Sequence, residues 1–211
     1  MKRLATIVLA VPLLLTGCVV PFGGATPTVT SNPPAGAKIF STLDEAGIEK
    51  IKASKSARLD MTTGYLRKSG VGLEDGSPEA PDVHISDGLM DLVIEAPYSA
   101  ITARTDRVRL NGLNKRADFS EVTYFLTAGS RDDFFALIRD GVDRYGIDHE
   151  SAEMVIKSIS RSPEDKTEFA IAPGTSTGLQ LTYDLRYDGA KDSQVIIVHV
   201  NGVPTTNGHT S

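Results

Sequence analysis

The N-terminal residues 1–18 decide how much of this chain is available for folding. Two basic residues follow Met1, an apolar run covers residues 4–15, and small residues lead to Cys18. This order is typical of a secretory signal peptide, which is removed from the mature protein. The apolar run is shorter than the roughly twenty residues that a membrane-spanning helix needs. We therefore expect residues 1–17 to be a signal peptide.

Leu15, Thr16, Gly17 and Cys18 resemble the lipobox of bacterial lipoprotein precursors. The resemblance implies cleavage between Gly17 and Cys18 and lipidation of the Cys18 thiol. Two or three acyl chains hold a protein stably on a membrane, where one chain is marginal. The alternative is an ordinary secreted protein with an incidental cysteine. The lipobox predicts a protein that is anchored by lipid on the extracytoplasmic face of the cell membrane.

Cys18 is the only cysteine of the chain, so no internal disulfide can form and the core must supply the stability. Removal of residues 1–17 takes away two of the 22 basic residues and none of the 27 acidic ones. The formal charge thereby changes from −5 to −7. This balance disfavours nucleic acid and anionic lipid head groups as partners of the folded part.

Composition divides the mature chain into three parts. Residues 19–37 are rich in Gly, Pro, Ser and Thr and carry no charged side chain, so residues 18–37 are expected to be a lipidated cysteine and a flexible tether. Residues 38–203 suit one globular domain. The polar residues 204–211 are expected to form a loose tail.

The apolar periodicity predicts an α+β fold in which a mainly antiparallel sheet packs against two helices. Residues 131–145 give the clearest helix, with Ser130 as the N-cap and Gly146 after its last turn. A first helix is expected to begin near Thr42, which has capping-box spacing with Glu45, and residues 69–88 are expected to form a long acidic loop. Sheet segments are expected at residues 57–63, 89–95, 101–110, 121–127, 152–159, 167–171, 179–187 and 194–200, the last of them central.

Residues 174–178 match the G-x-S-x-G pattern, with Ser176 at its centre. A nucleophilic serine in this pattern needs a strand before it and a helix after it. Here Pro173 precedes the pattern and a strand-like segment follows it, so a hairpin loop is the preferred interpretation. The sequence shows no phosphate-binding loop, dinucleotide fingerprint or paired metal cysteines. We therefore expect no enzymatic activity and no cofactor.

Two histidines are candidate functional residues: His84 lies among acidic residues, and His199 lies between two valines. Asp82 and His84 would share one face of a strand and could contribute to a metal site. Two ligands in an acidic loop are weak evidence, so a solvated loop is preferred and no metal is expected. His199 is expected to lie in the last strand as an ordinary sheet histidine.

From Glu121 to Val200 the layout resembles the mycobacterial LppA-like lipoproteins. The shared features are a strand that ends in Ala128-Gly129, an Asp-rich helix through Asp133 and Phe134, and an exit at Tyr145-Gly146 before antiparallel strands. The start of the first predicted strand, at residues 55–59, is similar to that of the LprG and LppX lipid-carrying lipoproteins. Both resemblances imply an actinobacterial source.

Two functions remain open from the sequence. The first is a non-enzymatic binding or interaction module, whose partner is an envelope protein or another ligand. The second is a carrier of a lipid or another apolar molecule in a hollow between sheet and helix. Such a hollow would be lined by Phe125, Phe134, Ile138 and Tyr183, which would instead fill a core in a packed module. A pocket of several hundred Å³ would distinguish the two.

Overall fold

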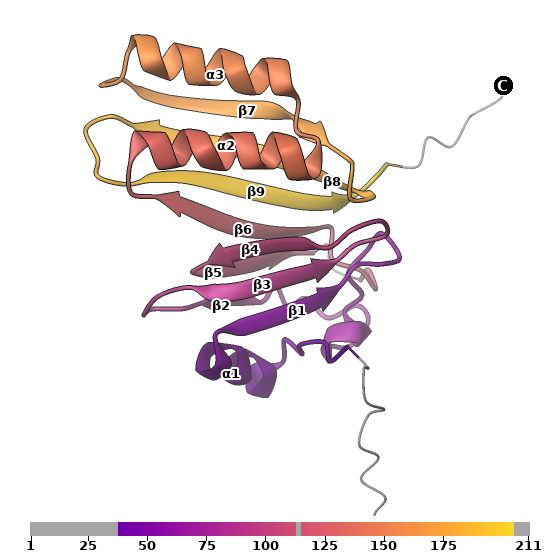
Figure 1. The fold of residues 1–211 in the computed structure, drawn as a ribbon. Coiled ribbons are helices and arrows are strands. Elements are labelled where there is room, and N and C mark those ends of the chain that lie inside the picture. The colour runs from indigo at the N-terminus through magenta and orange to yellow at the C-terminus, as the bar shows by residue number, and fades with distance from the viewer. Residues whose placement is uncertain (1–37, 113–114, 205–211) are drawn as a thin grey trace, which may run out of the picture. The chain divides into compact units, whose positions relative to one another are not determined.

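Two β-sheets and three α-helices form the part of the chain that the computed structural model describes, residues 38–112 and 115–204 (Figure 1). The larger sheet has six strands in the order β2-β5-β6-β9-β8-β7, and all neighbours in it are antiparallel. The smaller sheet has the order β1-β3-β4, with β1 and β3 parallel. The predicted α+β fold with a mainly antiparallel sheet is thus confirmed, and the last strand is central, as expected.

The elements follow one another along the chain with only short connections in the second half. The helices are α1 (Glu45–Ser54), α2 (Arg131–Tyr145) and α3 (His149–Arg161), with a short 3-10 helix at Ser69–Val71. The strands are β1 (Ser56–Asp60), β2 (Asp82–His84), β3 (Met90–Glu95), β4 (Ile101–Thr105), β5 (Arg107–Asn111), β6 (Glu121–Ala128), β7 (Lys166–Gly174), β8 (Leu179–Asp188) and β9 (Gln194–Gly202). None of the described helices is both long and apolar enough to cross a membrane.

Helix α2 has the bounds that its local sequence signals predict. The Ser130 hydroxyl accepts a hydrogen bond of 3.1 Å from the Asp133 N–H at the helix start. Gly146 has a left-handed conformation (φ 70°), and its N–H donates to the carbonyls of Gly141 and Val142. Serine at the N-cap and glycine after the last turn satisfy main-chain groups that the helix itself leaves unpaired.

The sequence prediction is wrong at two points in the helices. Residues 152–159 lie in α3 and not in the sheet. Asp148 caps α3 by accepting a bond of 2.8 Å from the Ser151 N–H, and the buried apolar residues recur at helical spacing (Ala152, Val155, Ile156 and Ile159). The first helix begins at Glu45, because Asp44 rather than Thr42 accepts from the Gly47 N–H at 2.8 Å.

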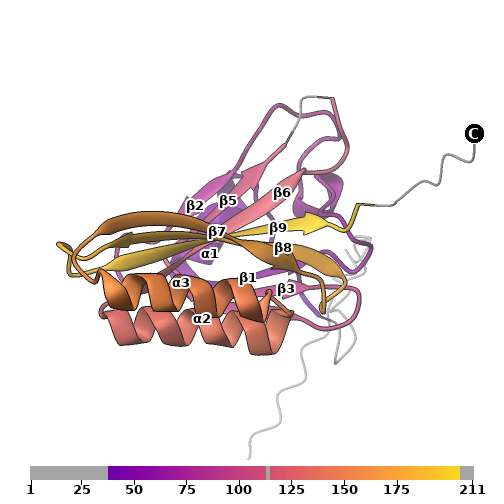
Figure 2. The same cartoon turned by 90° about the horizontal axis from the view of Figure 1, so that it is seen from above.

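The main core lies between the large sheet and the helices α2 and α3, which cover the same face of that sheet (Figure 2). Tyr124, Val198 and Tyr183 lie side by side across β6, β9 and β8 and are fully buried. Ile138 of α2 is also fully buried. Gly141 allows α2 to pack closely here, because a Cβ at this position would stand 2.6 Å from the Tyr183 ring.

The chain passes from the small sheet to the large one at a single residue, Asp106, which separates β4 from β5. The Thr105 hydroxyl donates to the Arg107 carbonyl (2.9 Å) and accepts from the N–H groups of Arg107 (3.1 Å) and Phe125 (3.3 Å). On the N-terminal side of Asp106, β4 pairs with β3 of the small sheet, whereas β6 pairs with β9 of the large sheet. The two sheets therefore separate next to α2.

A candidate groove between the small sheet and helix α2

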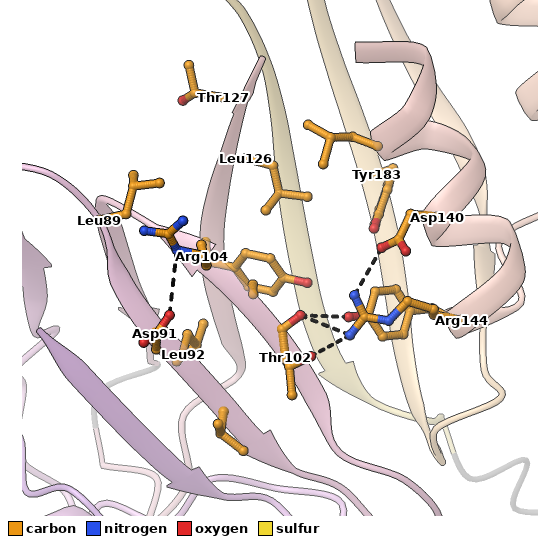
Figure 3. A pocket seen from close by; sticks show the side chains of 15 residues that line it. Leu89, Asp91, Leu92, Thr102, Arg104, Leu126, Thr127, Asp140, Arg144 and Tyr183 are labelled. Atoms are coloured by element: carbon orange, nitrogen blue, oxygen red, sulfur yellow. Dashed lines mark hydrogen bonds and ion pairs between the residues drawn. The ribbon is translucent and has the colours of Figure 1, made fainter. Parts of the chain in front are cut away.

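A cavity of about 510 Å³ lies where the two sheets separate (Figure 3). The strands β6 and β8 form its floor, β3 and β4 form one wall, and α2 forms the other. Leu89, Leu126 and Leu137 supply apolar surface to it. We refer to this cavity, between β4 and the α2 residues Leu137, Asp140 and Arg144, as the α2 groove.

Two tyrosines in the lining of the α2 groove carry hydroxyl groups that lack a partner. Tyr124 and Tyr183 are fully buried, and no other described residue forms a hydrogen bond with either hydroxyl oxygen. Burial raises the pKa of both phenols well above the usual value, so both stay protonated and can donate a hydrogen bond. A buried hydroxyl without a partner costs about 1–3 kcal/mol. The fold therefore holds two unpaired hydrogen-bonding groups next to one cavity.

Arg144 and Tyr145 close one end of the groove by joining α2 to β4. Arg144 Nη1 lies 3.0 Å from an Asp140 carboxylate oxygen, and its Nη2 donates to the Thr102 carbonyl at 3.1 Å. The Tyr145 hydroxyl donates to the same carbonyl at 3.0 Å. The Arg144 guanidinium also lies 4.8 Å from the centre of the Tyr145 ring, within the range of a cation–π contact. These contacts fix the width of the groove at this end (Figure 3).

The other end of the groove is more exposed. Arg104 Nε and Asp91 Oδ1 are 3.6 Å apart at its rim, and their side chains are 74% and 77% exposed. Such a surface pair contributes little to stability. A second hollow of about 570 Å³ continues along α2 to Gly129 and Asp133, and it shares Thr127, Leu137 and Asp140 with the first. The groove therefore follows α2 over most of its length.

Only one of the four residues that the sequence predicts as ligand-lining borders the groove. Tyr183 lines it, whereas Phe134 and Ile138 are fully buried in the core between α2 and the sheet. Phe125 follows Tyr124 on β6 and lies on the opposite sheet face, 5.7 Å from the Arg107 guanidinium. Sequence reasoning missed Tyr124, because apolar alternation alone does not show which buried side chains border a cavity.

The segment around Ser176 is the hairpin loop that the sequence predicts, since it connects β7 to β8. The Ser176 hydroxyl donates to the main-chain carbonyl of Arg144 at 3.3 Å. The residues that follow enter a strand and not a helix. The local geometry that a nucleophilic serine needs in this pattern is therefore not formed.

The expected solvated loop around the two candidate metal residues is wrong, because Asp82 and His84 lie on the strand β2, where two arginines contact the Asp82 carboxylate. Asp82 accepts a bond of 2.8 Å from Arg107 Nε and lies 3.6 Å from Arg109 Nε. The hydrogen bond from Arg107 lowers the pKa of Asp82 below its usual value. His199 lies on β9, as predicted, and its Nδ1 is 3.1 Å from Glu121 Oε1. Residues 38–112 and 115–204 contain no group of three or more His, Cys, Asp or Glu that could hold a metal ion.

The predicted cleavage and lipidation residues, Gly17 and Cys18, lie outside the described residues, as does the tether. Comparisons with protein-family models, curated proteins and solved structures find no match for this chain. The α2 groove is therefore interpreted from its own geometry.

Proposed function

We propose that this chain is a cell-envelope lipoprotein, anchored through lipid on Cys18, whose domain is a non-enzymatic module that binds a small amphipathic ligand in the α2 groove. The observation that carries the proposal is the cavity itself, whose lining brings the apolar Leu126 and Leu137 together with the phenols of Tyr124 and Tyr183. Both tyrosine hydroxyls are shielded from water in the empty site, so a ligand that bonds either of them must also displace neighbouring side chains. Such a bond would remove the cost of the unpaired group.

The form of the cavity supports a small ligand. Its volume of about 510 Å³ lies within the range of small-molecule sites, roughly 300–1,000 Å³. Such sites combine apolar walls with a few polar groups that fix the orientation of the ligand. Here Leu126 and Leu137 offer apolar contact, and Asp140 and Arg144 supply polar groups in the same lining.

The alternative is a carrier of a lipid or another apolar molecule. The hollow between sheet and helix, with Tyr183 in its lining, favours this alternative. The charged side chains Asp91, Arg104, Asp140 and Arg144 around the same hollow fit an amphipathic ligand better than a wholly apolar one. For this reason the binding module remains the preferred proposal.

Native mass spectrometry of the protein extracted from membranes tests the groove as the site. We expect a co-purifying small molecule in wild type and in Asp143→Trp, since Asp143 is exposed on α2 and does not line the groove. Leu137→Trp fills the groove and should remove that molecule. Equal retention by both variants would place the ligand elsewhere, and a molecule made only of acyl chains would favour the carrier.

The anchor has its own test. Cys18→Ala should abolish lipidation and move the protein from the membrane fraction to the soluble fraction. A variant that still partitions with membranes as wild type does would exclude lipid on Cys18 as the anchor.

The absence of catalysis is tested at Ser176. A serine-reactive fluorophosphonate should not label the wild-type protein, because Ser176 lies in a hairpin loop and donates to a carbonyl. Stoichiometric labelling that Ser176→Ala removes would contradict a non-enzymatic module.

A further inference from the structure

We propose that the ligand of the α2 groove is an extended peptide segment that adds as a further strand to the free edge of β4. The inference rests on the proposed function, because it takes the α2 groove as the binding site. It is carried by the direction of the β4 main chain, which is a different observation from the tyrosine hydroxyls.

The hydrogen bonds of β3 show which of its residues face each neighbour. The Asp91 N–H donates to the Lys55 carbonyl at 2.9 Å, and the Glu95 carbonyl accepts from the Met61 N–H at 2.8 Å. Both bonds lie on the side of β1. Because the main-chain groups of successive strand residues point to opposite sides, the even-numbered residues of β3 face β4.

This alternation determines the directions in which the main-chain N–H and C=O groups of β4 point. Leu92 and Ala103 are opposite each other, so Ala103 belongs to the residues that bond β3. Thr102 and Arg104 flank Ala103 and therefore point their N–H and C=O groups away from β3. The Thr102 carbonyl confirms this direction, since it accepts from Arg144 and Tyr145 of α2.

The edge of β4 is free where it borders the cavity. Within the described residues, β3 is the only strand that pairs with β4. Thr102, Ala103 and Arg104 all line the α2 groove. From the alternation of β4, the N–H of Thr102 and both main-chain groups of Arg104 point to the side of the strand that borders the cavity. Helix α2 forms the opposite wall of this cavity (Figure 3).

A peptide fits this arrangement better than other ligands of similar size. One peptide residue supplies a donor and an acceptor at the spacing that Arg104 presents, as paired residues do in an antiparallel sheet. Strand addition obtains affinity from such main-chain bonds and specificity from pockets for alternate side chains. Leu126 and Leu137 on one side of the added strand offer an apolar pocket of this kind. A non-peptide amphiphile would use the tyrosines without needing both groups of Arg104.

Two substitutions at Arg104 distinguish the contribution of its main-chain N–H to binding from that of its side chain. Arg104→Pro removes the outward N–H, while Ala103 and Thr105 keep their bonds to β3; proline is tolerated on an edge strand with its N–H side free. Arg104→Ala is the matched control, since it removes the side chain but retains the N–H. Circular dichroism and thermal unfolding check that both variants fold.

The probe is a fluorescein-labelled Thr-Leu-Thr-Leu-Thr peptide, and the protein is the mature chain with Cys18→Ala, which carries no lipid. We expect Arg104→Pro to bind the peptide at least roughly tenfold more weakly than Arg104→Ala, because both variants lack the arginine side chain and only Arg104→Ala retains the main-chain N–H. Equal binding by both Arg104 variants would overturn strand addition.

N-methylated peptides provide a second measurement that does not depend on the folding of a variant. An added strand bonds β4 along one of its edges only. One peptide carries methyl groups on both leucine amides, and a second carries them on two threonine amides. Only one of these two peptides should bind more weakly than the unmethylated peptide. Equal weakening, or none in either, would overturn the proposal.

Leu137→Trp distinguishes the failure of this inference from the failure of the proposed function. If Leu137→Trp abolishes binding while Arg104→Pro does not, the groove is the site and its ligand is not an added strand. If no peptide binds but the co-purifying molecule still depends on Leu137, only the peptide inference is wrong. Peptide binding that is unchanged by Leu137→Trp would contradict both.

Discussion

Helix α2 meets the rest of the domain in two different ways along its two sides. Phe134 and Ile138 are fully buried against the large sheet, and Gly141 allows the helix to approach Tyr183. Leu137 lies one residue before Ile138, and Asp140 lies two residues after it. Both are half-buried and border the α2 groove. One helix therefore contributes both to a packed core and to a cavity.

The difference arises from the strands and not from the helix. If β4 continued beside β6, side chains of the small sheet would reach α2 and fill the space. Instead the chain changes sheets at Asp106, and Thr105 bonds β6 through its side chain. The cavity is therefore a consequence of how the two sheets separate, and substitutions on the two sides of α2 should have different effects.

The largest effect is expected for Ile138→Ala. Ile138 has no exposed surface, so its truncation should cost about 2–4 kcal/mol in the free energy of unfolding, through lost burial and a residual cavity. Leu137→Ala should cost less than about 1 kcal/mol, because Leu137 borders space that is already open. Denaturant unfolding measures both. Equal costs would mean that the two sides of α2 are packed alike.

The second prediction concerns the close contact between α2 and β8. In Gly141→Ala the new Cβ would stand 2.6 Å from Cε2 and 2.8 Å from the hydroxyl of Tyr183. Relief of this clash requires movement of the Tyr183 ring or of α2, which should cost about 1–3 kcal/mol.

Gly129→Ala is the control for the second prediction, since a Cβ there would meet nothing within 4 Å. Thermal unfolding of both variants gives the comparison. A Gly141→Ala protein as stable as the Gly129→Ala protein would show that the packed side of α2 has room to adjust.

The packed side of α2 could be predicted from the sequence, whereas the groove could not. Ser130, Gly146 and the spacing of Phe134 and Ile138 are local signals, and they predict the bounds of α2 and its buried face. The alternation of β8 and the apolar run of β9 likewise predict strands, because the pattern needs no knowledge of the neighbours.

The missed features have physical reasons. The sequence of α3 does carry the local signals of a helix: Asp148 is an available N-cap, and the apolar residues recur at helical spacing (Ala152, Val155, Ile156 and Ile159). The groove depends on residues from β3, β4, β6, α2 and β8 that come together only in the fold. No local pattern indicates that β4 diverges from β6, so neither the cavity nor the place of Tyr124 in its lining could be predicted.

The third prediction uses the tyrosines that join the packed side to the groove. In the unfolded chain their phenols ionise near the ordinary tyrosine pKa of about 10, whereas burial raises the pKa of both in the native state. Above about pH 10 the unfolded state therefore binds fewer protons, and stability falls by up to about 1.4 kcal/mol per pH unit for each tyrosine.

Tyr183→Phe and Tyr124→Phe should each make this alkaline loss less steep. Each variant should also be as stable as wild type at pH 7, or more stable by up to about 1 kcal/mol, because the removed hydroxyl has no partner among the described residues. Urea unfolding between pH 7 and the alkaline range measures both effects. An unchanged slope in both variants would show that these hydroxyls are not shielded from water.

The smallest effect is expected on the surface of α2 that faces neither the sheet nor the groove. Arg139 Nε lies 3.2 Å from Glu153 Oε1 of α3, with side chains 54% and 42% exposed. An exposed pair of this kind contributes little, so Arg139→Ala should change the free energy of unfolding by less than about 0.5 kcal/mol. Any cost should disappear at about 1 M salt, where surface charges are screened. A loss above about 1 kcal/mol that persists in salt would mean that α3, rather than the sheet, holds α2 in place, and the contrast between its packed and open sides would then need a different cause.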